Sequence, residues 1–298
     1  TVHAAVHRPS TSAMPKTRSA APPRPSAARS TANATTRISF RSRKIVKTPP
    51  TKPLIVTTVP PPAPIAPPLP ALTAPGELAA ALRHLSSADP LLSAVIASTD
   101  APSFTSSPSL PAFHSLARSI LYQQLATSAA AAIYTRFLAL LPSASEGSPV
   151  SAVSPAAVLA LAAADLRAIG ISGRKAAYLH DLAARFAAGD LSESSVAAMD
   201  EEALLAQLTK VKGIGEWTVH MFMIFSLHRP DVLPSGDLGV RKGVQELYKL
   251  KALPKPEEMA ALCDRWRPYR SVGAWYMWRL LESKSATTKK AKKGNASS

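Results

Sequence analysis

The acidic residues of this 298-residue chain begin only at Glu77, and that boundary separates two kinds of sequence. Residues 1–76 hold 11 Lys and Arg, no Asp or Glu, and 16 of the 28 prolines. A segment with so few large apolar side chains cannot offset the entropy that it loses on ordering. We therefore expect a disordered, basic, Pro-rich tail over residues 1–76 and a folded domain that starts at residue 77.

The other end of the chain is also basic. Residues 283–298 contain five lysines and no acidic residue, so a second disordered tail is expected there. The two tails account for the whole formal net charge of +16, because residues 77–282 carry 19 basic and 19 acidic side chains. The basic pI therefore does not by itself make the folded domain a nucleic-acid binder. Within it, residues 210–282 have a net charge of +4 and are the better candidate to bind a polyanion.

The tails also bear on where the protein works. The basic runs at 41–44 and 289–293 are of the kind that serve as nuclear addresses. The early richness in Ser, Arg and Ala without acids is instead typical of a plastid or mitochondrial transit peptide. We favour the nucleus, with an organelle as the alternative, and the sequence leaves open whether the N-terminal tail is retained. No run of about 18 apolar residues predicts a membrane span.

Apolar residues recur at helical spacing from residue 77 onward, and no turn of the kind that joins two strands stands out. The pattern predicts an all-α domain, with two lobes divided between residues 113–142 and the later helices. A loop is expected at 144–149. The expected helices are 77–85, 90–97, 113–141 with a break near Thr127–Ser128, one starting at Pro155, 174–188, 201–208, 217–227 and 238–250.

Cysteine and histidine limit the possible cofactors. The single cysteine, Cys263, excludes a disulfide framework and any four-cysteine zinc or iron–sulfur site. The seven histidines show no close metal-ligand pairing. No cofactor is therefore expected to be required for catalysis.

The stretch Val211-Lys212-Gly213-Ile214-Gly215 lies between two expected helices. Glycines at 213 and 215 permit positive φ and let a ligand approach the backbone closely. The N–H groups at the start of the following helix have no intrahelical partners, and the helix dipole favours an anion there. A phosphate is a natural ligand for such a hairpin. An ordinary Gly-containing turn between helices is the alternative.

A single carboxylate, Asp237, begins the next helix. Asp is among the best N-cap residues, and a cap is the simplest interpretation. The helix N-terminus also favours the charged carboxylate, so the residue can cap the helix and act chemically at once. Such a group suits the stabilisation of a developing cation or the orientation of a water molecule. It suits general acid catalysis badly.

Near the C-terminus, aromatic and basic residues are interleaved. One interpretation is a buried core with arginines at its edge, and the other is a pocket wall that stacks on an extruded base while guanidinium groups reach phosphate. The residues are Trp266, Tyr269, Trp275, Tyr276 and Trp278, with Arg265, Arg267, Arg270 and Arg279.

Together these segments resemble the helix-hairpin-helix/Gly-Pro-Asp DNA glycosylases, and in particular their 3-methyladenine (alkylpurine) branch. The signature consists of the hairpin, the Pro-containing loop 232–236 and Asp237. Three further stretches also resemble this branch: 119–125, 170–179 and 266–279. The resemblance covers roughly residues 80–282 and leaves out the tails. It implies a two-lobed helical fold with the DNA site in the cleft.

The resemblance implies a monofunctional enzyme of base excision repair, which acts as a monomer on double-stranded DNA that contains alkylated bases. It would hydrolyse the N-glycosidic bond of a flipped-out purine such as 3-methyladenine or 7-methylguanine and leave an abasic site. Asp237 would be the catalytic residue. Bifunctional relatives carry a Schiff-base lysine where this chain has Trp217, so no lyase activity is expected. A non-catalytic helix-hairpin-helix DNA-binding module is the alternative.

The resemblance also assigns the residues around Asp237. Either Gln124 or Leu125 would fill the gap that the flipped base leaves in the duplex. The base pocket would be lined by Trp217, Met221, Leu238, Trp275 and Trp278. The DNA contacts would come from Gln123, Gln124, Leu125, Lys212, Gly213, Ile214, Gly215, Arg241, Lys242 and Arg270. A structural monovalent cation would be held by the main-chain carbonyls of Thr209, Val211 and Gly213.

Overall fold

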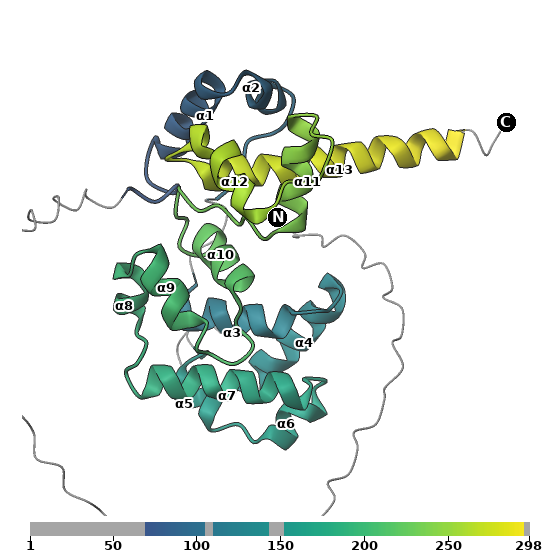
Figure 1. Ribbon diagram of the computed structural model, residues 1–298. Helices are drawn as coiled ribbons and strands as arrows, with labels where there is room; N and C mark the ends of the chain where they lie inside the picture. The colour runs from purple at the N-terminus through teal and green to yellow at the C-terminus, as the bar shows by residue number, and fades with distance from the viewer. Residues whose placement is uncertain (1–68, 105–109, 143–151, 295–298) are drawn as a thin grey trace, which may run out of the picture. The chain divides into compact units, whose positions relative to one another are not determined.

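The computed structural model describes residues 69–104, 110–142 and 152–294, with side chains as far as residue 284 (Figure 1). The expected tail up to residue 68, its basic run at 41–44 and the expected loop at 144–149 lie outside the described residues. Over the described ranges the regular structure is entirely helical, as the sequence predicted. None of the helices described is long and apolar enough to cross a membrane.

Each predicted helix is present, and the structure adds helices at 163–168, 193–198, 256–262 and 270–294 that were not among the expected helices. The expected helix over 113–141 is broken at 123–126, close to the break predicted from the sequence. The elements in chain order are α1 (Glu77–Ala88), α2 (Pro90–Ala97), α3 (Ala112–Tyr122), α4 (Thr127–Leu140), α5 (Pro155–Leu159), α6 (Ala163–Ala168), α7 (Gly173–Ala187), α8 (Glu193–Ala198), α9 (Glu201–Leu208), α10 (Glu216–Phe225), α11 (Leu238–Leu247), α12 (Pro256–Leu262), the 3-10 helix η1 (Asp264–Trp266) and α13 (Arg270–Gly294).

Local sequence explains where several helices begin. The Ser154 hydroxyl accepts a hydrogen bond from the amide of Ala157 at 3.2 Å, and Pro155 occupies the first turn of α5. The Asp200 carboxylate accepts from the amide of Ala203 at 2.8 Å at the start of α9. Each cap satisfies an amide that the helix itself leaves without a partner.

The contacts divide the helices into two groups. One group contains α1, α2, α11, α12, η1 and the first part of α13, and the other is built around α7, which packs on α3, α5 and α6 (Figure 1). The predicted division at 113–142 was therefore wrong. α3 and α4 belong with the helices that follow them, whereas α1 and α2 pair with helices near the C-terminus. Helical periodicity shows which face of a helix is apolar but not which helix will cover it.

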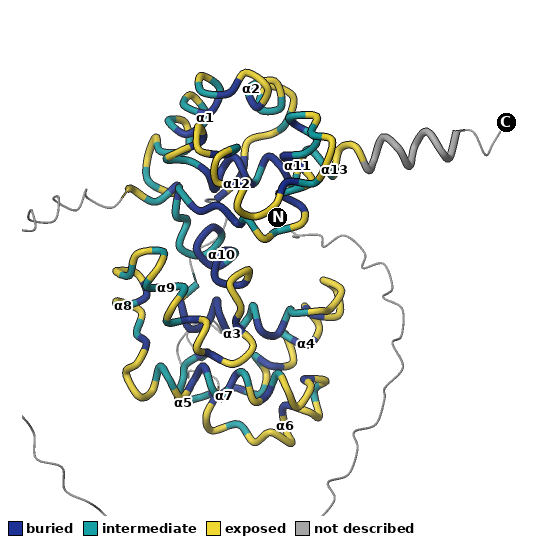
Figure 2. The backbone as a smooth tube through the Cα atoms, in the orientation of Figure 1, coloured by how far each residue is buried: buried dark blue, intermediate teal, exposed yellow. Residues whose placement is uncertain are grey.

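α10 is the most buried of the elements near the hairpin, as Figure 2 shows by its dark tube. Val219, Phe222, Met223 and Ile224 are all buried, in agreement with the predicted apolar helix. Each large apolar side chain removed from water contributes roughly 1.5–3 kcal/mol. α10 contacts both α9 and α3, so its position is fixed from two sides, while Trp217 in its first turn stays 39% exposed.

The buried carboxylate of Asp89 links α2 to η1 and to the end of α11, all in the group of helices that contains α1. Asp89 caps α2 by accepting from the amides of Leu91 and Leu92 at 3.1 and 3.2 Å. It also accepts from the indole of Trp266 at 2.9 Å and from the hydroxyl of Tyr248. Burial alone would raise the pKa of Asp89, but these hydrogen bonds outweigh burial and the pKa lies below its ordinary value.

The C-terminal end of the domain differs from the prediction. α13 continues to Gly294, so the disordered tail expected from residue 283 is wrong at its start. Residues 277–293 contain neither Gly nor Pro, and nothing in this stretch interrupts a helix. Lys284 also forms an ion pair with Glu246 of α11, which fastens the helix at that point.

Candidate active site

Asp237 lies at the N-terminus of α11, where the sequence placed it. Its Oδ1 accepts a hydrogen bond from the amide of Val240 at 2.8 Å, so Asp237 is the N-cap of the helix. Its own amide donates to the carbonyl of Pro234 at 2.9 Å. The loop before α11 therefore fixes the main chain of Asp237, and the helix fixes one carboxylate oxygen.

Two indole rings hold the same carboxylate. Nε1 of Trp278 donates to Oδ1 at 2.9 Å, and Nε1 of Trp217 donates to Oδ2 at 2.6 Å. One ring comes from α13 and the other from α10, so the carboxylate joins three helices. Hydrogen bonds to a charged acceptor are stronger than neutral ones and fix its orientation.

The two rings differ in their own support. Trp278 is partly buried, and its ring packs on Phe225 with a centroid separation of 5.8 Å. A Cβ at Gly239 would lie 2.8 Å from Cδ1 of Trp278, so the absence of a side chain there admits the indole. Trp217, which donates to Asp237, and Leu238, which follows Asp237 in sequence, are both exposed large hydrophobic residues. A charged carboxylate among accessible aromatic and apolar groups can stabilise a cation next to it.

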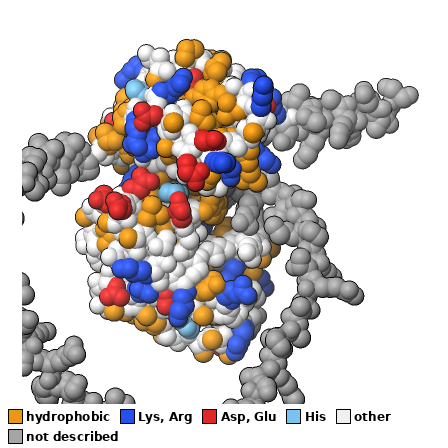
Figure 3. Space-filling model, viewed as in Figure 1, with side chains coloured by type: hydrophobic (Ala, Val, Ile, Leu, Met, Phe, Trp, Pro, Cys, Tyr) orange, Lys and Arg blue, Asp and Glu red, His pale blue; other side chains and the backbone are white. Residues whose placement is uncertain are grey.

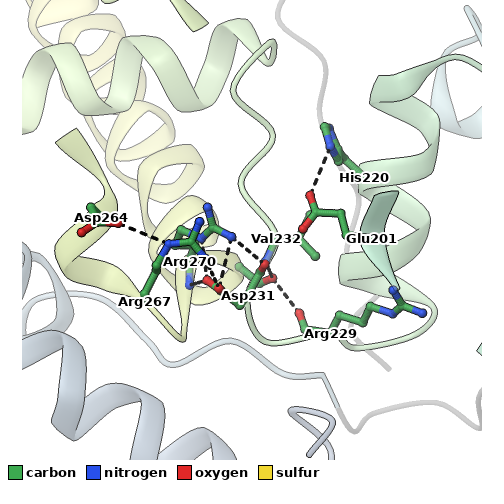
Figure 4. A network of polar contacts seen from close by, with 9 residues as sticks. Glu201, His220, Arg229, Asp231, Val232, Asp264, Arg267 and Arg270 are labelled. Carbon is green, nitrogen blue, oxygen red and sulfur yellow. Dashed lines mark hydrogen bonds and ion pairs between the residues drawn. The ribbon is translucent and has the colours of Figure 1, made fainter. Parts of the chain in front are cut away.

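The loop that leads to Asp237 is anchored by a polar network (Figure 4). Nε of Arg270 lies 2.5 Å from Oδ1 of Asp231, and Nη2 donates to Oδ2 and to the carbonyl of Asp231, each at 3.1 Å. Arg267 donates to Oδ2 of Asp231 at 2.8 Å. Arg270 is only 8% exposed. Its guanidinium holds the loop to α13, and its assignment as a DNA contact stays a prediction.

The same network continues toward α9 and α10. The hydroxyl of Ser271 donates to the carbonyl of Arg229 at 2.6 Å and accepts from the amide of Val232 at 3.0 Å. Further along, Nε2 of His220 lies 3.7 Å from a carboxylate oxygen of Glu201 (Figure 4). Burial raises the pKa of Glu201 and lowers that of His220. The Glu201–His220 pair joins α9 to α10.

The hairpin between α9 and α10 uses its two glycines differently. Gly213 has φ +80°, and a Cβ on it would lie 2.1 Å from Cδ2 of Tyr178. Gly215 has φ −104°, an extended conformation that any residue adopts, so the expectation of positive φ applies only to Gly213. The hairpin thus packs with its backbone directly against an aromatic ring of α7.

Two hairpin amides are already used within the protein. The amide of Lys212 donates to Oδ2 of Asp181 at 2.9 Å, and that of Ile214 donates to the carbonyl of Val211 at 3.1 Å. The amides of Gly215 and Glu216 donate to no acceptor in the part of the chain that the structure describes. These two amides, at the start of α10, are therefore available to an anion.

The turn between α3 and α4 lies beside the hairpin. Nε2 of Gln123 donates to the carbonyl of Gly213 at 2.8 Å. Gln124 has φ +56°, which is uncommon for a residue other than glycine, and Leu125 is an exposed large hydrophobic residue. The structure brings together the 123–125 turn and the hairpin, two segments about 90 residues apart that the resemblance assigned to DNA contact.

The remaining candidate residues have mixed surroundings. Lys242 is exposed, whereas Nε of Arg241 donates to the carbonyl of Pro254 at 2.7 Å and holds the loop before α12. Met221 is partly buried in α10.

The aromatic segment near the C-terminus is divided between helix contacts and core. The ring of Trp275 packs on Tyr276 at 5.0 Å and under Arg279 at 5.4 Å, both in its own helix. Of the aromatic segment, Trp266 and Tyr276 are fully buried and belong to the core, not to a pocket wall.

Two of the three carbonyl groups predicted to bind a monovalent cation already accept hydrogen bonds. The carbonyl of Gly213 accepts from Gln123, and that of Val211 accepts from the amide of Ile214. A carbonyl oxygen has two lone pairs, so these bonds leave room for a second partner. Among the described residues no group of three or more His, Cys, Asp or Glu could hold a metal ion. The cation at Thr209, Val211 and Gly213 stays a prediction.

Known proteins match this chain over the segments that form the site. The sequence model of the HhH-GPD superfamily of base excision DNA repair proteins matches residues 117–268, a range that includes the α3–α4 turn, the hairpin and Asp237. The chain belongs to the HhH-GPD superfamily. The family that the sequence motifs indicated is therefore confirmed.

Individual relatives agree with the family match. This HhH-GPD chain is 33% identical over 168 residues to DNA-3-methyladenine glycosylase 1 of Schizosaccharomyces pombe, covering 56% of this chain and 71% of that protein. It is 32% identical over 170 residues to a protein of Bacillus subtilis named putative DNA-3-methyladenine glycosylase, covering 57% of this chain and 59% of the length of that relative. The solved structure of an S. pombe 3-methyladenine DNA glycosylase in complex with abasic DNA superimposes with a TM-score of 0.57 and 30% identity, over 67% of this chain and 95% of that chain.

Some residues that shape the site of this HhH-GPD protein were missed from the sequence. Tyr178 and Asp181 lie more than 30 residues before the hairpin and contact it directly. Tyr178 falls in the 170–179 stretch of the resemblance, but nothing in the spacing indicated a contact with Gly213. Asp181 has no local signal, because an isolated Asp in a helix usually faces solvent.

Proposed function

We propose that this HhH-GPD protein is a monofunctional DNA glycosylase that hydrolyses the N-glycosidic bond of alkylated purines in double-stranded DNA. The observation that carries the proposal is the carboxylate of Asp237, held by the indole N–H groups of Trp217 and Trp278. A carboxylate fixed among aromatic rings combines the two things the reaction needs. These are a negative charge for the sugar and ring faces for a cationic base.

The chemistry follows from that arrangement. The damaged nucleotide is extruded from the duplex so that its sugar reaches Asp237. A purine alkylated at N3 or N7 carries a positive charge, and its glycosidic electron pair moves to the base, which departs neutral. The charge is then on the sugar, where the carboxylate stabilises it. Water adds to the sugar carbon and releases a proton, so the products are free base and an abasic site.

The indole of Trp217 beside Asp237 favours hydrolysis alone. Strand cleavage through a Schiff base requires a primary amine that attacks the sugar. Trp217 supplies an indole at the position where the resemblance places such a lysine, and this indole donates to the carboxylate. The ammonium of Lys212 lies 3.5 Å from Oδ1 of Asp181 and is held on the α7 side of the hairpin. The product is then an abasic site in an uncut strand.

DNA placement in this proposal relies on local geometry. Basic and acidic side chains are mixed over the face shown in Figure 3, which carries no single broad basic patch. The hairpin would bind a backbone phosphate through the amides at the start of α10. The 123–125 turn beside it would enter the duplex, with Gln124 or Leu125 in the gap. The protein would act as a monomer without a catalytic cofactor, in the nucleus, with a monovalent cation at the hairpin as a further prediction.

A base-release assay tests the proposal. The full chain is incubated with DNA methylated at purine nitrogens, and free 3-methyladenine and 7-methylguanine are measured. Asp237→Asn is expected to abolish release while binding to abasic DNA is retained, and Asp165→Asn, an exposed residue of α6, serves as the charge-matched control. Full activity in Asp237→Asn contradicts the proposed mechanism. DNA binding by the wild-type chain with no base release supports the alternative of a non-catalytic binding module.

A further inference from the structure

One face of α7 contacts both segments that are proposed to meet DNA. Lys175, Tyr178, Asp181 and Arg185 follow one another at three- and four-residue spacing and therefore share a face of the helix. Nζ of Lys175 donates to the carbonyl of Leu121 at 2.7 Å, near the end of α3. This bond holds the main chain just before the 123–125 turn.

The middle of the same face holds the hairpin. The ring of Tyr178 lies against Gly213, so closely that a Cβ there would be 2.1 Å from Cδ2. Asp181 accepts from the amide of Lys212 at 2.9 Å, and Nη2 of Arg185 donates to the carbonyl of Lys210 at 2.8 Å. Arg185 also donates to Asp181 at 3.3 Å. The hairpin and Lys210, the residue just before it, are thus fixed to α7 at three points.

We infer that Asp181 and Tyr178 are positioning residues, which hold the hairpin in the shape that binds a DNA phosphate. The inference rests on the proposed function. Asp181 accepts from the amide of Lys212, while the amides of Gly215 and Glu216 donate to no acceptor among the described residues. The Gln123 bond to the carbonyl of Gly213 then places the 123–125 turn in register with the same hairpin.

The inference opposes the simple electrostatic expectation. An acidic residue close to a DNA-binding segment repels phosphate, so its removal should tighten binding. If Asp181 instead shapes the hairpin, removal of its hydrogen bond must weaken binding although a negative charge is lost. Asp181→Ala and Asp181→Asn separate the two accounts, because both lose the charge but only asparagine keeps an oxygen that accepts from Lys212.

The test measures the affinity of the full chain for a duplex that carries one tetrahydrofuran abasic analogue. Asp181→Ala is expected to weaken binding about 10-fold, the effect of one hydrogen bond to a charged group. Asp181→Asn is expected to stay within about threefold of wild type. The slope of log affinity against log salt concentration should fall by the value of about one phosphate contact in Asp181→Ala. It should not fall in Asp181→Asn. Asp190→Ala, an exposed residue just after α7, is the control for charge alone.

Each outcome bears on the inference. Alanine and asparagine variants that bind equally, or an alanine variant that binds as tightly as wild type, overturn it. If Asp181→Ala does not fold, Tyr178→Leu removes the support of Gly213 without a charge change, and unchanged affinity in that variant overturns it instead. A wild-type chain that binds the duplex but releases no alkylated base contradicts only the proposed function. A wild-type chain that binds no DNA overturns both.

Discussion

The indole nitrogen of Trp217 lies 2.6 Å from Oδ2 of Asp237 and donates a hydrogen bond to it. This contact joins the first turn of α10 to the N-cap of α11, 20 residues further along the chain. Trp278 donates to the other oxygen, so the carboxylate cannot rotate without loss of at least one bond. The two indoles orient the group that is proposed to face the sugar.

Trp217→Phe and Trp278→Phe test that role, because phenylalanine keeps an aromatic ring and loses the N–H donor. Each is expected to lower the rate of base release under saturating enzyme by about 10-fold, the value of one hydrogen bond to a charged acceptor. KM for alkylated DNA should change little. Trp275→Phe is the matched control, since the ring of Trp275 contacts Tyr276 and Arg279. Equal rates in all three variants would show that the indole donors have no part in catalysis.

Gly239→Ala should displace the Trp278 ring. The added Cβ would lie 2.8 Å from Cδ1 of Trp278 and 3.0 Å from Oδ1 of Asp237, so the ring must move away from the carboxylate. We expect loss of most base-release activity with a decrease of about 1–3 kcal/mol in the free energy of unfolding, typical of overpacking. Urea unfolding and single-turnover release measure the two effects. Gly173→Ala, whose Cβ would meet nothing within 4 Å, should leave both unchanged.

Gly213→Ala should be costly for two separable reasons. The residue has φ +80°, and the new Cβ would overlap the ring of Tyr178. In a double-mutant cycle with Tyr178→Ala, the overlap disappears and only the backbone cost remains. The effect of Gly213→Ala on unfolding is then expected to shrink by about 1 kcal/mol or more in the Tyr178→Ala background. Additive effects would mean that the ring does not limit residue 213.

Arg270→Gln should affect folding and not DNA binding. The substitution removes the main partner of Asp231, which is partly buried. Breaking such a pair lowers the free energy of unfolding by about 3 kcal/mol. The salt dependence of DNA binding should stay as in wild type, because the guanidinium of Arg270 faces the loop. Arg267→Gln, with its side chain 52% exposed, should cost no more than about 1 kcal/mol. A lower salt dependence of DNA binding in Arg270→Gln than in wild type would show that Arg270 contacts a phosphate.

Asp89 should make the protein sensitive to acid. Its pKa in the folded state lies below its ordinary value, so its stabilising contribution is complete above the unfolded pKa of about 3.9 and is lost as the pH falls through the lower folded value. Asp89→Asn cannot titrate, and its free energy of unfolding should vary less between about pH 4 and pH 2. At pH 7 the variant should be less stable by about 2 kcal/mol. Urea titrations across this range check both statements, and parallel pH curves would contradict them.

Local signals predicted much of this structure. The helices that follow Ser154, Asp200 and Asp237 begin where the sequence indicated, since a helix start depends on residues a few positions apart. A helix over 217–227 was also predicted, and its composition, apolar on nearly every side, accounts for the burial of α10. The hairpin and Asp237 were also found from short patterns, and the family match includes both.

Contacts between distant segments were not predicted. The pairing of α1 and α2 with the C-terminal helices, the role of Arg270 as a loop anchor and the support of Gly213 by Tyr178 all join residues far apart in the chain. The sequence does not show whether a charged or aromatic side chain faces solvent, DNA or another helix, because packing determines its partner.

The sequence by itself determined that the domain is helical, where its helices start, and that a Gly-containing hairpin is followed by a capping Asp237. These properties depend on torsion preferences and hydrogen bonds within a few residues. Only the tertiary structure decided that both oxygens of Asp237 are held by Trp217 and Trp278, and that α7 fixes the hairpin. Those contacts form when separate helices bury their apolar faces together, and the resulting distances depend on the whole core.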